Sequence, residues 1–235
     1  MTNIQQRTPD QGLQIRVNAF EAIQDRLIPN HVLLDYVQAT YPAFADFWLF
    51  RRQFAYQLAG ISFLTYILHM RDRNPARLNI ARSTGNIWGS EFTPSFHPQR
   101  PMFHNNEAVP FRLTPNLQML LGPIALEGIF SASMLVIAKA LTEPDATKLE
   151  QQLSIFIRDE ITFHLTAAHR PNLPTTQLRE CVTQNAGSVM NRARQFSVPE
   201  KSGSLPANQT VLDVIARAVD PRKLAQMDPL WMPYL

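Results

Sequence analysis

The chain has 235 residues, with 22 basic and 19 acidic side chains, and this balance does not indicate a nucleic-acid-binding protein from composition. Apolar residues make up 45% of the chain, enough for a substantial core, and the single cysteine, Cys181, excludes an internal disulfide framework. There are 18 prolines and only 8 glycines, and we find neither a glycine-rich phosphate-binding loop nor a Walker-type sequence.

The N-terminal third of the chain reads as helical. Residues 1–12 are polar and predict a disordered N-terminus, followed by an amphipathic helix over residues 13–27. Asn30 predicts the cap of a short helix that runs to about Ala39. Residues 46–70 predict the longest helix, which is apolar nearly all round. Its polar interruptions and its length indicate a buried core helix rather than a membrane span.

A charged loop and a short hairpin follow this helix. Residues 71–77 read RDRNPAR, and two apolar runs over residues 78–81 and 87–90 flank a turn that contains Gly85 and Asn86. Such a pattern predicts a β-hairpin. The acidic residue Glu91 stands after it. A helix, a charged loop, a hairpin and an acid form the layout of a protein-kinase-like catalytic centre.

Residues 94–110 are rich in proline and predict a loop, which leads into VPFRLT at residues 109–114. Thr114 before Pro115 is a good helix start. Helices are then expected over residues 116–121, 127–141, 148–168 and 176–194. In the last of these, Arg192 is expected on a solvated face.

The C-terminal part reads as a separate module. Residues 197–207 predict a linker, and residues 208–219 a short helix. The terminal sequence LWMPYL is too apolar to be left in water. We therefore expect residues 208–235 to fold back onto the preceding domain. Trp231 is the expected main anchor, with Tyr234 and Leu235 beside it.

The loop at residues 71–77 resembles the catalytic loop of the phosphatidylinositol-kinase-related kinases, and residues 109–114 closely resemble the segment that ends their activation loop. Nearly the whole chain from about residue 13 is similar to the C-terminal part of one branch, the transformation/transcription domain-associated protein family, and its fungal members look closest. The stretches that carry this resemblance are FADFWLFRRQF, STGNIWGSE, VPFRLTPNLQ, EQQLSIFIRDE, LPANQTV and LWMPYL.

The resemblance assigns residues to an altered catalytic centre. Asp72 matches the catalytic base, while Asn74 stands where the kinases have a histidine. Arg77 replaces the metal-binding asparagine, and Glu91 replaces the metal-binding aspartate. An asparagine carbonyl can coordinate Mg²⁺, whereas a guanidinium only donates hydrogen bonds and repels a cation. This argues against ordinary phosphoryl transfer. We also expect Arg77 and Glu91 to form an ion pair in place of the metal.

The motif that ends the activation loop comprises Val109, Pro110, Phe111, Arg112, Leu113 and Thr114. The resemblance implies a mainly α fold: a kinase-like C-lobe over residues 13–196, with a small β-hairpin at the degenerate catalytic centre. A short helical FATC module over residues 208–235 follows.

The family implies a function as well as a fold. It implies a non-catalytic pseudokinase and FATC part of a nuclear transcription coactivator scaffold, without cofactor or metal. Its partners would be subunits of histone acetyltransferase complexes of the SAGA type and, through the whole scaffold, transcription activators. Neither nucleic acid nor membrane is an expected direct partner.

Two other hypotheses stay open at the level of sequence. The chain could be an active protein or lipid phosphotransferase, with Asp72 as base and Glu91 holding metal. It could also be a stand-alone helical binding protein without kinase ancestry. Phosphate transfer from ATP that depends on Asp72 would favour the first, and a fold without the helix, loop and hairpin would favour the second.

Overall fold

The computed structural model describes residues 9–70, 74–90, 107–142, 148, 151–152, 172, 174–196 and 207–235. The fold is mainly α, as predicted, and in the described residues its helices are α1 Pro9–Arg26, α2 Val32–Thr40, α3 Phe44–Leu68, α4 Pro115–Ile124, α5 Ser131–Thr142, α8 Thr175–Arg194, α9 Ala207–Val219 and α10 Pro221–Leu224. The predicted helix over residues 148–168 lies largely outside them, as do most of the proline-rich loop and the linker.

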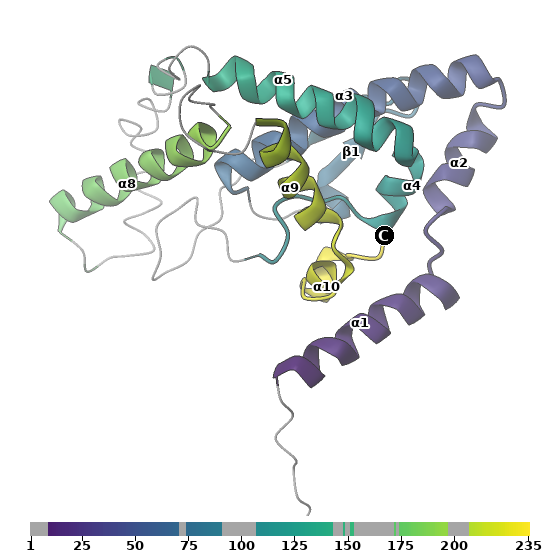
Figure 1. Cartoon of the computed structure of the whole chain (residues 1–235), viewed down its shortest axis with the longest axis horizontal. Coiled ribbons are helices and arrows are strands. Elements are labelled where there is room, and N and C mark those ends of the chain that lie inside the picture. Colours follow the sequence, from purple (N-terminus) through teal and green to yellow (C-terminus); the bar gives the residue numbers. More distant parts are fainter. Residues whose placement is uncertain are drawn as a thin grey trace, which may run out of the picture.

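Helix α3 is the centre of the molecule (Figure 1). It packs against α4, α5, α8 and strand β2. Phe54, Leu58 and Phe63 on this helix are fully or almost fully buried, which confirms the prediction of a core helix. Other apolar side chains of the same helix, including Leu49 and Tyr56, are about half exposed, so burial does not extend all round it.

A sharp kink divides the helical run that covers one side of α3. Gly122 has a positive φ of 65°, and Pro123 follows it without an N–H to donate. The Leu121 carbonyl accepts a hydrogen bond from Arg51 Nε at 2.7 Å. The first helix thus ends where the sequence predicted. Helical structure resumes in a π-helical turn, η2 Ala125–Phe130, before the predicted start at residue 127.

By length and composition alone, Pro115–Leu141 would suffice to cross a membrane, a feature that the sequence analysis had not singled out. In the fold this stretch packs against α3 and α9.

The hairpin forms as predicted, with β1 Leu78–Ile80 antiparallel to β2 Ile87–Gly89 and Asn79 opposite Trp88. Gly85 at the turn has a φ of 75°, and a Cβ there would lie 2.7 Å from the Phe50 carbonyl oxygen. This close approach requires glycine. Gln53 of α3 also donates to the Asn86 side chain at 2.8 Å, so the hairpin is fixed to the core helix.

The C-terminal segment packs between the body and α1. Helix α9 contacts α5, and α10 contacts α1, which projects from the rest of the molecule (Figure 1). A second buried cluster joins these parts and consists of Phe20, Val109, Leu224, Met227 and Trp231.

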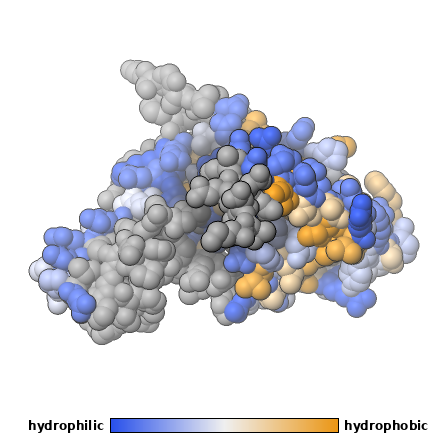
Figure 2. Space-filling model, turned by 90° about the horizontal axis from the view of Figure 1, so that it is seen from below, coloured by the Kyte–Doolittle hydropathy of each residue, from blue (hydrophilic) through white to orange (hydrophobic). Residues whose placement is uncertain are grey.

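Two helix starts differ from the prediction at the N-terminal end. Helix α1 begins at Pro9, so residues 9–12 are helical rather than disordered. The N-cap of α2 is His31 rather than Asn30, and its side chain makes no capping hydrogen bond. In the view of Figure 2 the apolar surface is concentrated toward one end of the molecule. In and just before α2, Leu27, Val32 and Tyr36 are exposed.

Candidate functional site

The charged loop follows the end of α3, and two structural features fix this helix end. His69 adopts the left-handed conformation, with φ 45° and ψ 55°, that commonly terminates a helix. Arg192 of α8 donates to the carbonyl oxygens of Tyr66 at 3.1 Å and Ile67 at 2.6 Å. A cation at the negative end of a helix is favourable. The loop therefore starts from a rigid point.

Arg192 is buried rather than solvated, so the sequence prediction for this residue is wrong. Burial lowers the pKa of Arg192 to about 10, with the Tyr66 hydroxyl acting in the opposite direction, and the guanidinium stays charged at neutral pH. The Nδ1 atom of His69 is buried and finds no hydrogen-bond partner among the described residues.

Asn74 and Arg77 bound a short turn, η1 Pro75–Arg77. The Asn74 Oδ1 accepts a hydrogen bond from the Ala76 N–H at 2.9 Å, so this oxygen acts as a helix cap. Arg77 is exposed. Asp72 and Glu91 lie outside the described residues. Among those that are described, no group of three or more His, Cys, Asp or Glu residues is placed to hold a metal ion.

The main chain brings Arg77 opposite the residue that precedes Glu91. The Ser90 N–H donates to the Arg77 carbonyl oxygen at 2.9 Å, one step beyond the pairing of Leu78 with Gly89. The hairpin therefore brings Arg77 opposite Ser90, the last described residue before Glu91. The ion pair between Arg77 and Glu91 stays a prediction, since Glu91 itself is not described.

The second part of the candidate site is the segment at residues 109–114. All six of its residues are buried, and four side chains have no solvent exposure: Val109, Phe111, Leu113 and Thr114. Phe111 packs against Phe130, with ring centroids 6.3 Å apart. Thr114 stands at the predicted N-cap of α4, but its side chain makes no capping hydrogen bond. Pro115 occupies the first helical turn, as expected.

Arg112 joins this segment to the end of the chain in what we call the C-terminal clamp, formed by Arg112 and the main chain of Trp231, Met232 and Leu235. The guanidinium donates to the three carbonyl oxygens at 2.6, 3.1 and 2.7 Å respectively. Its carbon lies 4.8 Å from the centre of the Trp231 ring, a cation–π distance. Burial lowers the pKa of Arg112 to about 10, so it is charged at neutral pH.

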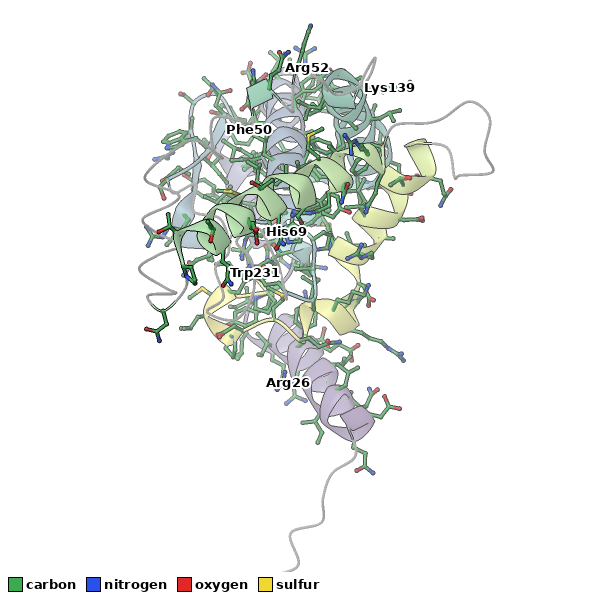
Figure 3. The ribbon with its side chains drawn as sticks, turned by 90° about the vertical axis from the view of Figure 1, so that its left-hand side faces the viewer. Arg26, Phe50, Arg52, His69, Lys139 and Trp231 are labelled. Atoms are coloured by element: carbon green, nitrogen blue, oxygen red, sulfur yellow. The ribbon has the colours of Figure 1, made fainter. Side chains whose placement is uncertain are left out.

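Trp231 is the most buried large side chain of the last turn, at 5% exposure, and lies between the body and α1 (Figure 3). Its Nε1 atom is buried and has no hydrogen-bond partner among the described residues. Tyr234 is half-buried in the same cluster, and Leu235 is 37% exposed at the surface.

Asn116 is a functional candidate that the sequence analysis missed. It is 2% exposed, accepts from the Leu33 N–H at 3.2 Å and donates to the Tyr234 carbonyl oxygen at 3.3 Å. It thus connects α2, α4 and the end of the chain. In the sequence, Asn116 follows Pro115 at a helix start. This pattern predicts a helix cap rather than a link between distant segments.

The two parts have different chemical capacities. The loop offers an exposed arginine and an asparagine oxygen engaged in a cap, which are poor ligands for Mg²⁺. The clamp offers a buried cation that holds main-chain carbonyls, a packing role rather than a reactive one.

Comparison with known proteins agrees with this layout of a lobe followed by a terminal module. Residues 3–166 match the phosphatidylinositol 3- and 4-kinase family, and residues 204–235 match the FATC domain. The chain belongs to the phosphatidylinositol 3- and 4-kinase family. Within this family, it is a relative of the transformation/transcription domain-associated proteins.

Two of the relatives are yeast subunits of the SAGA and NuA4 acetyltransferase complexes. The chain is 37% identical to TRA1 of Saccharomyces cerevisiae over 96% of its length, and 39% identical to Tra1 of Schizosaccharomyces pombe over 94%. It is 30% identical over its whole length to the human transformation/transcription domain-associated protein. In each case the chain spans only 6% of the relative.

Solved structures support the fold. The FAT and kinase domain of CtTel1 superimposes with a TM-score of 0.68, covering 99% of this chain and 15% of that chain at 19% identity. The open conformation of CtTel1 gives a TM-score of 0.69 at 20% identity, covering 99% of this chain and 8% of that chain. The kinase-like architecture is therefore confirmed.

Proposed function

We propose that the chain is the pseudokinase lobe and FATC module of a transcription coactivator scaffold that joins histone acetyltransferase complexes. The observation that carries this proposal is the similarity to the two yeast subunits of SAGA and NuA4, which extends over at least 94% of the chain. Its partners are acetyltransferase-complex subunits and, through the full-length scaffold, transcription activators. It works in the nucleus, without direct contact to nucleic acid or membrane.

The loop supports a non-catalytic role within this scaffold. Arg77 stands at the position of the metal-binding asparagine and Glu91 at that of the metal-binding aspartate, with Asn74 in place of a histidine. Catalysis of phosphoryl transfer depends on positioning and on metal electrostatics. A guanidinium at a metal position repels the cation and cannot position it. Asp72 alone does not restore such a centre, so we propose that the lobe needs neither nucleotide nor metal.

The clamp supports an architectural role for the C-terminal module. We propose that residues 13–196 form the lobe and residues 208–235 the FATC module, with Trp231, Tyr234 and Leu235 as its anchor. Arg112 and Asn116 receive that anchor through four hydrogen bonds to main-chain oxygens. The buried segment at residues 109–114 would thus hold the module in a fixed position on the lobe.

The test uses the full-length protein that contains this chain, purified by affinity from cells. We expect acetyltransferase activity on histones to co-purify with it, together with the other complex subunits. The same preparation is then assayed for phosphate transfer from ATP to protein and to phosphatidylinositol. No transfer above background is expected. Absence of acetyltransferase subunits would refute the scaffold proposal.

The second candidate function is an active phosphotransferase, which the match of residues 3–166 to the phosphatidylinositol 3- and 4-kinase family favours. Asp72 would act as base and Glu91 would hold metal. Transfer from ATP that Asp72→Ala abolishes would establish this candidate and reject the pseudokinase proposal. An Asp72→Ala protein with unchanged background signal would reject it.

A further inference from the structure

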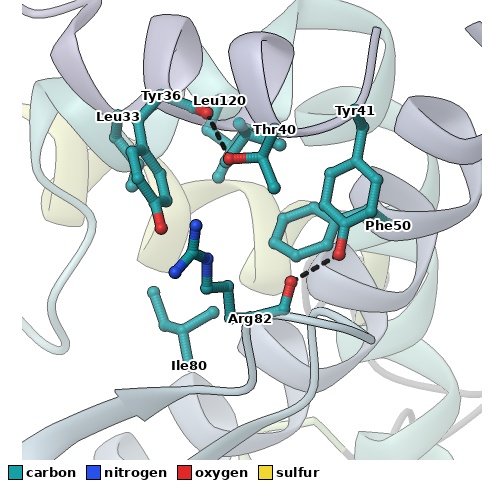
Figure 4. Close-up of a pocket in the computed structure, with 9 residues that line it drawn as sticks. Leu33, Tyr36, Thr40, Tyr41, Phe50, Ile80, Arg82 and Leu120 are labelled. Atoms are coloured by element: carbon teal, nitrogen blue, oxygen red, sulfur yellow. Dashed lines mark hydrogen bonds between the residues drawn. The ribbon is translucent and has the colours of Figure 1, made fainter. Parts of the chain in front are cut away.

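An apolar pocket of about 270 Å³ lies between α2, the hairpin and the core (Figure 4). Its apolar lining is contributed by Leu33, Val37, Phe50, Ile80 and Leu120. These residues come from α2, α3, β1 and α4, so the cavity is built from elements that the fold already holds rigid. None of them belongs to the degenerate loop or to the C-terminal clamp.

Arg82 and Tyr36 form the polar rim of this pocket. The guanidinium carbon lies 5.8 Å from the centre of the Tyr36 ring, and Figure 4 shows the guanidinium directed into the cavity beside Ile80. The rim is anchored through its main chain, because the Tyr41 hydroxyl donates to the Arg82 carbonyl and the Thr40 hydroxyl donates to the Tyr36 carbonyl. No acidic side chain among the described residues forms an ion pair with Arg82.

This combination has a specific chemical preference. An apolar cavity with one cation at its mouth suits a ligand that is apolar at one end and anionic at the other. The volume is slightly below the range of about 300–1,000 Å³ typical of small-molecule sites. It is therefore better matched to one inserted side chain than to a whole cofactor.

We propose that the pocket docks a peptide segment of a partner protein, which inserts one aromatic or large aliphatic side chain and places a neighbouring carboxylate on Arg82. The surrounding surface favours a macromolecule, since Tyr36 is 50% exposed and Val32 on the same helix is 47% exposed. Both residues belong to α2, the helix that also supplies Leu33 and Val37 to the pocket. This inference rests on the proposed scaffold function in that the partner is a protein.

The binding test uses the 235-residue chain and fluorescein-labelled probe peptides in a fluorescence anisotropy titration. The acidic peptide is Glu-Glu-Trp-Glu-Glu. Its two controls replace either the four Glu residues by Gln or the Trp by Ala. We expect the acidic tryptophan peptide to bind most tightly and both controls to bind at least about tenfold more weakly, because each lacks one of the two contacts. Raising the salt concentration should weaken binding of the acidic peptide.

Four variants locate the binding. Arg82→Gln should weaken binding by about tenfold or more, while Arg82→Lys keeps the charge and should weaken it less. Ile80→Phe fills the cavity and should also weaken binding. Arg222→Gln removes an exposed arginine on α10, which does not line the pocket, and should leave binding unchanged. Thermal melting of each variant identifies any loss of folding, and Arg82→Lys preserves the test if Arg82→Gln is unstable.

Several outcomes would overturn the proposal. These are no binding of the acidic tryptophan peptide, equal binding of the Gln control, or unchanged binding to folded Arg82→Gln. Indole-3-propionate that binds as tightly as the peptide would indicate a small-molecule site instead. Self-association that Arg82→Gln abolishes would indicate a second copy as the occupant. If the full-length protein recovers acetyltransferase subunits but the chain binds no peptide, only the docking proposal is rejected and the scaffold proposal is unaffected.

Discussion

Arg77 and Arg112 mark two regions of the same lobe that are stabilised in opposite ways. Arg77 is exposed, and its main chain is bonded to Asn74 and Ser90 in a local turn and hairpin. Arg112 is 8% exposed, and its hydrogen-bond partners lie between 119 and 123 positions further along the sequence. The bonds of the first region are local, whereas those of the clamp join segments that lie far apart in the sequence.

An exposed side chain such as that of Arg77 can be exchanged with little loss of packing. A buried segment tolerates little, because each of its side chains has a fixed neighbour. The substitutions below each change one of the two regions, and the change in the free energy of unfolding should decrease from the first to the last.

The largest effect is expected for Trp231→Ala. This substitution removes a buried ring from the cluster that contains Phe20 and Leu224, and it should lower the free energy of unfolding by about 3–5 kcal/mol. The neighbouring Leu230 is 75% exposed, so Leu230→Ala should change it by less than about 0.5 kcal/mol. Urea unfolding of the two variants measures the difference, and equal losses would contradict the anchor assignment.

Arg112→Gln should come second, with a loss of about 2–3 kcal/mol, because main-chain oxygens at the end of the chain lose their charged donor. Hydrogen exchange of the Leu235 amide, which donates to Met232, should accelerate in this variant. The matched control is Arg77→Gln in the exposed loop, for which we expect less than about 1 kcal/mol. A larger loss for Arg77→Gln would reverse the comparison of the two regions.

Asn116→Ala should cost about 1–2 kcal/mol, since it leaves the Leu33 N–H and the Tyr234 carbonyl without their shared partner. Gln118→Ala removes a single bond to the Leu113 carbonyl from a half-buried residue and should cost less. Thermal unfolding of both variants tests this ranking. A larger effect for Gln118 would show that Asn116 does not bridge the two segments.

The smallest effect concerns the predicted ion pair of Arg77 and Glu91. A double-mutant cycle with Arg77→Gln and Glu91→Gln should give a coupling energy of about 0.2–1 kcal/mol, as expected for an exposed pair. Adding MgCl₂ to the unmodified chain should leave its melting temperature unchanged. Zero coupling would dismiss the ion pair, and a clear stabilisation by Mg²⁺ would indicate that the loop still binds metal.

Local patterns predicted the parts of the fold that are determined locally. The turn with Gly85 and Asn86 identified the hairpin, and the nearly continuous apolar pattern identified α3 as a core helix. The apolar terminal sequence, together with the family resemblance, indicated that the end of the chain folds back. The position at which it docks, beside Arg112, agrees with that expectation.

Features that depend on contacts between distant residues could not be predicted in the same way. The sequence pattern puts Arg192 on a polar helix face. In the structure α8 packs against the end of α3, where Arg192 donates to the carbonyls of Tyr66 and Ile67. Asn116 likewise has two partners that lie 83 and 118 residues away. The contacts of Trp231 are equally distant in the sequence, since its ring packs against Phe20 and its carbonyl accepts from Arg112.

The most direct test of the scaffold account compares the two regions in the full-length protein. Asp72→Ala in the loop and Trp231→Ala at the clamp are each introduced, and the recovery of acetyltransferase subunits by affinity purification is measured. We predict unchanged recovery with Asp72→Ala and a marked loss with Trp231→Ala. Loss of recovery with Asp72→Ala, together with full recovery with Trp231→Ala, would contradict the account.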